Sequence, residues 1–280
     1  MSADAPEGAR HFELELKLFL EALYLRYDYD FRHYSHASLK RRITAAMTRL
    51  ECRSVTQLQE RVIHDAACFP VLLDFLTVQV SDMFRDPSYF RGLREKVVPL
   101  LRTYPSLKIW VAGCSAGEEA YSLAILLREE GLLNRSLIYA TDINAAALKR
   151  AESGVFDIER LPQFTQNHRE SGASSSLSDY YTAAYGGALF DPSLRERIVF
   201  SDHSLATDAV FAEVQLVSCR NVLIYFDRTL QDRALSLFHE ALSHKGFLGI
   251  GAKESVRFSS HAAKFQELVA TDRIYRKVGL

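Results

Sequence analysis

Cysteine is scarce in this 280-residue sequence, and its distribution excludes two kinds of site. The four cysteines have no CxxC spacing and no histidine at ligand-like intervals: Cys52, Cys68, Cys114 and Cys219. A structural zinc centre and a disulfide framework both require cysteines grouped in such patterns. We therefore predict no metal site and no disulfide framework.

Long apolar runs and an excess of charge of one sign are also absent. No run approaches the roughly 18 apolar residues of a membrane-spanning helix, and the N-terminal segment is polar. The formal net charge of -1 at pH 7 excludes a globally basic nucleic-acid binder. We expect a cytoplasmic protein, a monomer by default, with no membrane insertion and no nucleic-acid partner.

The first part of the chain has helical periodicity, because apolar residues recur at steps of three and four from about residue 11 to residue 76. We predict a helical domain over residues 1–80 and a linker over 81–95 that carries Arg85. One of the helices concentrates positive charge at Lys40, Arg41 and Arg42. This basic run is either a solvated face or a docking surface for an acidic partner.

From about residue 96 to residue 280, strand and helix patterns alternate as in a doubly wound, mostly parallel sheet. The predicted strands are Lys108–Ala112, Leu137–Thr141, Ile198–Phe200, Val214–Ser218, Phe247–Gly251 and Ile274–Val278. The predicted helices are Glu118–Glu130, Ala145–Ser153 and Thr229–Ser243. Residues 156–197 fit neither period, and their Ser/Gly-rich turn and strand-prone aromatics predict a small inserted β subdomain.

A loop of small residues joins the first strand to the helix that follows it. Gly113 and Gly117 would let a ligand approach the backbone closely, as in nucleotide-binding α/β proteins. Their spacing is not GxGxxG, and no Gly-Lys-Ser/Thr follows, so dinucleotide and P-loop interpretations weaken. Glu118 and Glu119 disfavour a phosphate here and favour a nucleoside that carries positive charge. S-adenosylmethionine, with its sulfonium and ammonium groups, has this chemistry.

The second predicted strand ends at Asp142. A carboxylate at this position, roughly 20–30 residues beyond a glycine loop, can grip the two hydroxyls of a ribose. Asp142 could instead be the N-cap of the helix that follows. Its coupling to the glycine loop favours the ribose role.

Five blocks of sequence together resemble the CheR-type chemotaxis receptor methyltransferases, and with the helical N-terminal domain they span nearly the whole chain. The blocks are residues 80–86 (VSDMFRD), 113–122 (GCSAGEEAYS), 140–143 (ATDI), 219–226 (CRNVLIYF) and 246–251 (GFLGIG). The resemblance implies a class I methyltransferase fold and S-adenosylmethionine as methyl donor, with S-adenosylhomocysteine as product. It further implies methylation of glutamate side chains on the cytoplasmic helices of a chemotaxis-type receptor, which sets sensory adaptation.

The resemblance also assigns site residues. Arg85 and Tyr225 correspond to side chains beside the transferred methyl, although an interdomain salt bridge of Arg85 to Glu118 or Glu119, or simple core packing of Tyr225, stays open. The positions that match cofactor-binding residues are Gln79, Ser81, Arg85, Gly113, Glu118, Glu119, Asp142, Ser204, Leu205, Cys219, Arg220 and Asn221. Of the two glutamates, either can receive the ligand's ammonium. In some relatives the inserted subdomain binds a receptor's C-terminal peptide by strand addition, which the sequence leaves undecided here.

The sequence departs from the family pattern at a few positions. Ser204 stands where asparagine is frequent, and Ala116, Ala120 and Met83 also replace commoner residues. None of these changes removes a charge that methyl transfer needs, so we expect an active enzyme. The alternatives are a non-catalytic adaptor of the same fold and a methyltransferase acting on small molecules or nucleic acid. The last of these is disfavoured by Cys-Arg-Asn-Val after the fourth strand, where an Asn/Asp-Pro-Pro-aromatic block would be expected.

Overall fold

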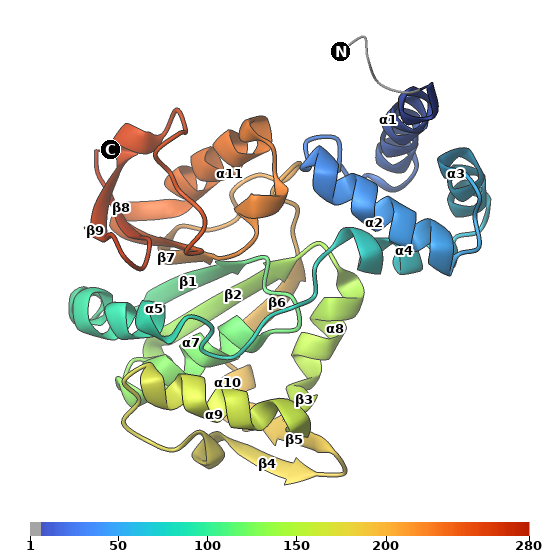
Figure 1. The fold of residues 1–280 in the computed structure, drawn as a ribbon. Helices are drawn as coiled ribbons and strands as arrows, with labels where there is room; N and C mark the ends of the chain where they lie inside the picture. Colours follow the sequence, from blue (N-terminus) through green and yellow to red (C-terminus); the bar gives the residue numbers. More distant parts are fainter. Residues whose placement is uncertain (1–6, 280) are drawn as a thin grey trace. The chain divides into compact units, whose positions relative to one another are not determined.

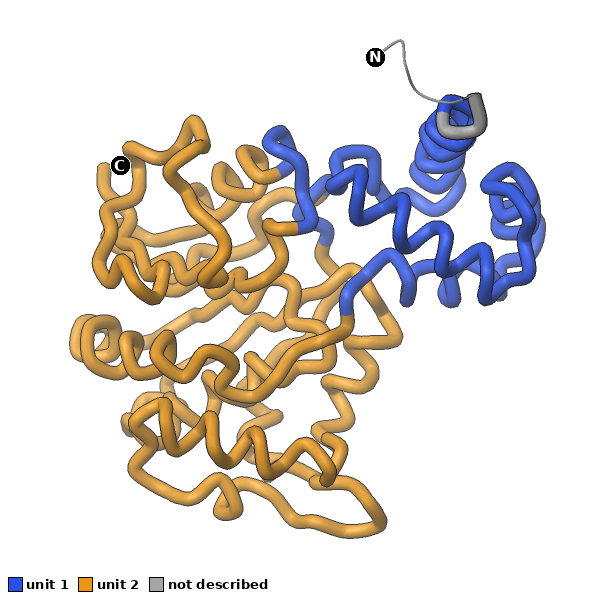
Figure 2. Tube along the Cα trace, in the orientation of Figure 1, with its two compact units in different colours: residues 1–78, 204–207, 225–230 blue, residues 79–203, 208–224, 231–280 orange. Residues whose placement is uncertain are grey.

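A computed structural model describes residues 7–279 of the chain (Figure 1). The chain forms two compact units (Figure 2). Unit 1 contains the residues up to 78 together with 204–207 and 225–230, and unit 2 contains 79–203, 208–224 and the residues from 231 onward. A division at residue 80 alone is therefore incomplete, because two short later segments belong with the helical unit.

Unit 1 is built on four helices. They are α1 (Glu7–Tyr27), α2 (His36–Arg49), α3 (Val55–His64) and α4 (Cys68–Leu76). Their apolar faces are buried at helical spacing, as at Leu39, Ile43 and Ala46 of α2. Ser54 caps α3 by accepting a hydrogen bond from the Gln57 N–H. The predicted N-terminal helical domain is confirmed.

The segment 225–230 is held in unit 1 by backbone pairing. Tyr34 and Phe226 form an isolated antiparallel bridge, and their rings meet edge to face with centroids 5.0 Å apart. The Ser35 N–H donates to the Tyr225 carbonyl oxygen at 2.7 Å. The backbone that carries Tyr225 is thus fixed by the chain that leads into α2.

Unit 2 is centred on a mostly parallel sheet, as predicted, and the sheet has seven strands, six of which match predicted ones. In spatial order the strands are β6 (Ile198–Asp202), β2 (Ser136–Asp142), β1 (Leu107–Ala112), β7 (Val214–Cys219), β8 (Leu242–Ile250), β10 (Ile274–Lys277) and β9 (Phe265–Val269). The first five are parallel, and the last two run antiparallel to their neighbours. The strand order reverses direction between β1 and β7, and such a switch point opens a crevice at the carboxyl ends of parallel strands.

Helices cover both faces of this sheet. They include α5 (Pro87–Gly92), α7 (Glu118–Glu129), α8 (Ala145–Ser153) and α11 (Arg228–Ala241), and α11 lies on the opposite face from α5 and α7 (Figure 1). Trp110 of β1 packs against Phe238 of α11 with ring centroids 5.4 Å apart. Short turns of this unit lie at Val98–Leu101 (α6), Leu133–Arg135 and Ala262–Lys264, and the turn at Leu223–Tyr225 ends where the chain enters unit 1.

The predicted linker over residues 81–95 is part of unit 2 instead of a free connection. Most of it is helical, since α5 continues into a π-helical turn at Leu93–Val97. Phe84, Phe90 and Leu93 are buried in the main core of the unit. Arg85 therefore projects from a packed segment.

The inserted region contains the predicted small antiparallel sheet, with strand order β3-β5-β4. These strands are β3 (Val155–Asp157), β4 (Tyr181–Ala184) and β5 (Gly187–Phe190). It also contains an unpredicted helix, α9 (Leu161–Glu170), and short turns at Ile158–Arg160, Leu177–Tyr180 and Pro192–Arg195. The pattern missed α9 because its buried face includes the polar residues Asn167 and His168.

Candidate functional site

The loop after β1 is shaped by its glycines. Gly113 has φ +76°, and a Cβ there would lie 2.5 Å from the Val222 side chain. Gly117 has φ +96°, and a Cβ there would lie 2.9 Å from the Ala151 Cβ. Both glycines are therefore required by backbone conformation and by neighbouring side chains. The Gly113 N–H donates to the Thr141 carbonyl oxygen at 2.8 Å, which joins the loop to the end of β2.

Asp142 closes this loop from the tip of β2. Its Oδ2 accepts from the Ser115 N–H at 2.8 Å and its Oδ1 from the Asn144 N–H at 3.0 Å. Burial raises the pKa of this carboxyl group, and the N–H donors oppose the shift. The alternative role as helix N-cap is wrong, because Asn144 caps α8 by accepting from the Ala147 N–H. The ribose role stays a prediction.

Glu118 is the more deeply buried acid of the loop, with a relative exposure of 1%. Its Oε1 accepts from Arg160 at 2.8 Å, whereas its Oε2 is buried without a hydrogen-bond partner among the described residues. Burial raises the pKa of Glu118, and Arg160 opposes that shift. An unpaired buried oxygen on a carboxylate favours a cationic ligand group at this position.

Glu119 is engaged at both carboxylate oxygens. Ser218 donates to one at 2.6 Å, and Arg220 donates to the other at 3.1 Å. Arg220 is itself buried, bonds Asp86 at 2.8 Å and stacks over the Tyr89 ring at 4.1 Å. Arg220 and Glu119 thus neutralise each other in a built network, which leaves Glu118 as the acid with open capacity.

Arg85 pairs with neither of these acids. Within the described residues its guanidinium donates to the Val80 carbonyl oxygen at 3.3 Å, while Glu118 and Glu119 bond Arg160 and Arg220. The interdomain salt bridge considered for Arg85 is therefore wrong, and the half-buried side chain keeps donor capacity.

Three other predicted residues of unit 2 lie near the glycine loop, beside Arg160 and at the end of β7. Gln79 is joined to the glycine loop, because the Ser115 hydroxyl donates to its Oε1 at 2.8 Å. Ser81 is half-buried, and its carbonyl oxygen accepts from Arg160. The Cys219 side chain is fully buried at the end of β7, and burial raises the pKa of its thiol well above the usual range. A cofactor contact at Cys219 would therefore use the backbone.

Asn221 follows β7 in a left-handed conformation with φ +61°. Glu254 fixes this turn by accepting from the N–H groups of Asn221 at 3.1 Å, Ile224 at 3.1 Å and Gly251 at 2.5 Å. Burial raises the pKa of Glu254, and the backbone donors oppose the shift. Sequence reasoning missed both Glu254 and Arg160, because each acts through residues distant in the chain.

Three predicted site residues belong to unit 1 instead. Leu205 is buried, the Ser204 hydroxyl accepts from the Ala206 N–H at 3.3 Å, and Tyr225 is anchored by the backbone pairing described above. That these three residues form one site with the residues of unit 2 stays a prediction.

The basic run on α2 divides into two faces. Lys40 and Arg41 are exposed, whereas Arg42 is buried at 8% exposure and donates to the Leu76 carbonyl oxygen. The prediction of Arg42 as a docking residue is therefore wrong. Its position on the apolar stripe of the helix turns it inward.

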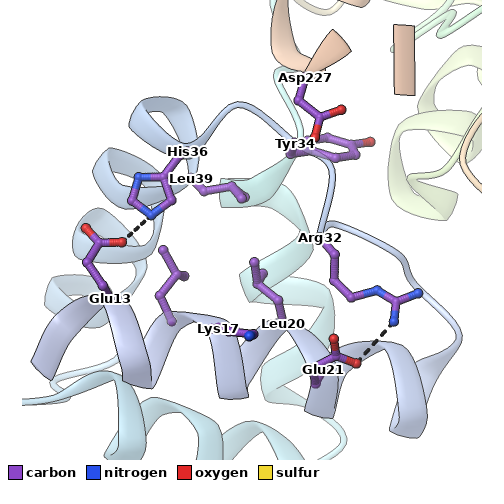
Figure 3. Close-up of a pocket in the computed structure, with 10 residues that line it drawn as sticks. Glu13, Lys17, Leu20, Glu21, Arg32, Tyr34, His36, Leu39 and Asp227 are labelled. Carbon is purple, nitrogen blue, oxygen red and sulfur yellow. Dashed lines mark hydrogen bonds and ion pairs between the residues drawn. The ribbon is translucent and has the colours of Figure 1, made fainter. Parts of the chain in front are cut away.

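Unit 1 also contains a cavity of about 470 Å³ between α1 and α2 (Figure 3). A side-chain contact of His36 with Glu13 and an ion pair of Arg32 with Glu21 lie among its lining residues. Ten residues form its wall: Glu13, Leu16, Lys17, Leu20, Glu21, Arg32, Tyr34, His36, Leu39 and Asp227. None of them is a predicted cofactor or docking residue.

No group of His, Cys, Asp and Glu side chains within residues 7–279 is arranged to hold a metal ion. Over the same range, no helix is long and apolar enough to cross a membrane.

Comparison with known families identifies both parts of the chain. Residues 79–274 match the family described as "CheR methyltransferase, SAM binding domain", and residues 14–77 match "CheR methyltransferase, all-alpha domain". The chain belongs to the CheR methyltransferase family. Its class I methyltransferase fold, its cofactor S-adenosylmethionine and its place among chemotaxis methyltransferases follow from this membership.

Individual relatives support the same assignment. A Pseudomonas putida protein named "Putative methyltransferase Cher3" is 57% identical over 268 residues, covering 96% of this chain and 98% of the relative. A "Chemotaxis protein methyltransferase" of Listeria monocytogenes is 30% identical over 229 residues, covering 81% and 84%. Among solved structures, the glycopeptide N-methyltransferase MtfA is 12% identical with a TM-score of 0.37, covering 61% of this chain and 50% of that one. That likeness is too low to add to the assignment.

The residues of unit 2 fit S-adenosylmethionine. The buried, unpaired Oε2 of Glu118 suits the cofactor's ammonium, and the carboxylate of Asp142 suits two ribose hydroxyls. Both acids adjoin the same loop, since Asp142 binds the Ser115 N–H and Glu118 begins α7 directly after Gly117.

Proposed function

We propose that this CheR-family methyltransferase transfers the methyl group of S-adenosylmethionine to glutamate side chains on the cytoplasmic helices of a chemotaxis-type receptor. The product is a methyl ester, the enzyme class is protein-glutamate O-methyltransferase, and the biological result is sensory adaptation. The family membership and the relatives named chemotaxis protein methyltransferase support the proposal. The observation that carries it is Arg85, a guanidinium with open donor capacity on a packed segment of unit 2.

Methyl transfer to a glutamate side chain requires little chemical activation by the enzyme. The glutamate carboxyl group, with a reference pKa of about 4.3, is already an ionised nucleophile at neutral pH, so no general base is required. The protein must instead orient the carboxylate and exclude water, and orientation can lower a barrier by several kcal/mol.

Each site residue then has a defined task. The bound cofactor supplies an activated methyl on its sulfonium. Glu118 holds the ammonium, and Asp142 holds the ribose hydroxyls. Arg85 steers the substrate carboxylate through its forked donors, and Tyr225 presents its hydroxyl beside the methyl. On the partner side, exposed Lys40 and Arg41 attract the acidic methylation helix.

The proposal is tested by transfer of labelled methyl from S-adenosylmethionine to receptor cytoplasmic fragments, with alkali releasing labelled methanol from an ester. Calorimetry for the cofactor and for S-adenosylhomocysteine accompanies the assay. Cofactor binding without transfer to any fragment would favour the adaptor alternative. Label that is stable to alkali would indicate a different acceptor group, and no binding of either ligand would contradict the enzyme assignment.

A further inference from the structure

Arg42 occupies an unusual place for an arginine, because it lies on the inward face of α2. It shares the buried stripe of this helix with Leu39, Ile43 and Ala46, while Lys40 is on the exposed face. Burying a cation is costly unless partners compensate for the lost water.

Two elements hold the Arg42 guanidinium. One nitrogen donates to the Leu76 carbonyl oxygen at the end of α4, where helix carbonyl groups favour a cation. The guanidinium carbon lies 4.6 Å from the centroid of the Tyr225 ring, within the range of a cation–π contact. Its second terminal nitrogen is buried without a partner among the described residues. The ring of Tyr225 is thus a principal partner of this buried charge.

Tyr225 is otherwise fixed through its backbone. The Ser35 N–H donates to its carbonyl oxygen at 2.7 Å, and the Asp227 N–H donates to the His33 carbonyl oxygen at 2.8 Å. These bonds set the path of the chain but leave the side-chain torsions of Tyr225 free. The contact with Arg42 restricts the orientation of the ring.

We propose that Arg42 is a positioning residue for Tyr225, holding its aromatic ring in place from α2. This inference rests on the proposed function, in which the Tyr225 hydroxyl acts beside the transferred methyl. The helix whose outer face is proposed to dock the receptor would then also set the placement of a catalytic side chain. Arg42 contributes to turnover through Tyr225 and does not contact the receptor.

Two substitutions separate the features of Arg42. Arg42→Met keeps much of the apolar stem but removes the charge, and Arg42→Lys keeps the charge without a planar fork that can stack and donate at once. Arg49→Met, which changes an exposed arginine at the C-terminal end of the same helix, is the matched control. Thermal unfolding and cofactor calorimetry show whether each variant is folded. If Arg42→Met does not fold, Arg42→Lys takes its place in every comparison below.

The kinetic experiment is a double-mutant cycle with Tyr225→Leu, measured with labelled methyl transfer to a receptor fragment. Arg42→Met should lower kcat about tenfold with KM for both substrates nearly unchanged, because misorientation of a reacting group slows turnover. The double variant should be no slower than Tyr225→Leu alone, since residues acting through one contact are not additive. Arg49→Met should change neither constant.

Three kinetic outcomes would overturn the inference. Multiplying effects in the double variant would show that Arg42 acts independently of Tyr225. A raised receptor KM at unchanged kcat would make Arg42 a docking residue after all. Full recovery of kcat in Arg42→Lys would show that the planar stack is not needed.

A readout independent of activity keeps this inference separate from the proposed function. The protein is labelled with 3-fluorotyrosine at its 13 tyrosines, and Tyr225→Phe identifies the resonance of Tyr225 by its loss. Arg42→Met should shift that fluorine resonance, and Arg49→Met should not. An unshifted resonance would overturn the contact. A shifted resonance in a chain that transfers no methyl would leave the contact standing and overturn the proposed function.

Discussion

At the residue scale, adjacent carboxylates at the start of α7 have different electrostatic surroundings. Successive helical residues point about 100° apart, so Glu118 and Glu119 face different neighbours. Glu119 is neutralised by the buried guanidinium of Arg220, whereas Glu118 shares Arg160 and keeps one buried oxygen without a described partner. Two identical side chains thus differ in their capacity: the charge of Glu119 is neutralised by Arg220, whereas Glu118 keeps an oxygen that could bind a cation.

This difference predicts that Glu118→Gln weakens binding of S-adenosylmethionine. Loss of a charged hydrogen bond typically costs about 1.5–3 kcal/mol, so the affinity should fall by roughly tenfold to a hundredfold in calorimetry. Glu152→Gln, at an exposed position on α8, is the control and should bind normally. Equal affinities of Glu118→Gln and the wild type would contradict the assignment of Glu118 to the ammonium.

The pH dependence of this effect has a definite sign. Because burial raises the pKa of Glu118 above its usual 4.5, the carboxylate is protonated at a higher pH than that of an exposed glutamate. Cofactor affinity should therefore fall as the pH drops toward that raised pKa, and the difference from Glu118→Gln should narrow. The stability of the cofactor-free chain responds in the opposite sense. In the cofactor-free chain, the contribution of Glu118 to the free energy of unfolding is present below pH 4.5 and is lost as the pH rises through the raised pKa.

Arg85→Ala should largely abolish methyl transfer, by about a hundredfold or more, because the substrate carboxylate loses its steering group. Cofactor binding should stay measurable, since Glu118 and Asp142 are unchanged. Arg91→Ala, an exposed arginine of α5, is the control. Unchanged turnover in Arg85→Ala would remove Arg85 from the proposed site.

The sequence predicted the positions of the candidate site residues, but it did not predict which side chains they pair with. Strand-end positions such as Gly113 and Asp142 follow from local pattern, because parallel strands present their carboxyl ends together. The partners do not follow, since the ion pair of Arg160 with Glu118 spans 42 residues and that of Arg220 with Glu119 spans 101. Such long-range pairs have no local signature.

At the element scale, a buried polar cluster joins α7 to the inserted region. The Glu129 carboxylate accepts from Arg94 of the π-helical turn, from His168 of α9 and from Ser175. The side chains of Glu129 and His168 are each 1% exposed. Burial alone would raise the pKa of Glu129, but these donors outweigh it and lower the pKa to about 2.

Glu129→Gln should therefore destabilise the protein by about 3 kcal/mol near neutral pH, because it removes one of the two carboxylates that neutralise the buried Arg94, the other being Glu130. A lowered folded-state pKa gives stability that is present above the ordinary pKa of 4.5 and lost as the pH falls toward about 2. The gap in unfolding free energy between variant and wild type should accordingly shrink across that window in denaturant titrations. Glu170→Gln, exposed on α9, is the control; a gap independent of pH would contradict this account.

Elements with a regular pattern were predictable, and those stabilised by polar contacts were not. The parallel strands follow from short apolar runs, and α8 follows from its periodicity. Helix α9 did not, because Asn167 and His168 on its buried face are satisfied by Met83 and Glu129 from other elements. The outer strand β9 was also missed, since two of its five residues, Gln266 and Glu267, are exposed and polar.

At the scale of the whole molecule, charge is balanced overall but concentrated locally. The net charge is -1, yet Lys40 and Arg41 stand together on the exposed face of α2. Lys40 has Glu13 at 3.9 Å, a distance at which an exposed pair contributes little. Positive potential on this face can therefore act on an acidic partner.

Reversing Lys40 and Arg41 to glutamate should raise the apparent KM for the receptor fragment several-fold and leave the KM for S-adenosylmethionine unchanged. The effect should diminish at high ionic strength, where exposed charges are screened. Lys149→Glu, an exposed reversal on α8, is the control. A receptor KM that is insensitive to salt would contradict electrostatic docking.

Residues 225–230 complete unit 1, although they are synthesised long after its four helices. The side chains of His33 and Asp227 are hydrogen-bonded at 2.9 Å although 194 positions of sequence separate them, so closing this contact encloses most of the chain. During synthesis from the N-terminus, the four helices can emerge and pack early, but unit 1 cannot be completed until this late segment has left the ribosome. The first unit to be made is therefore among the last to be finished, and a fragment ending at residue 78 lacks the piece that holds Tyr34 and Arg42 in their native contacts.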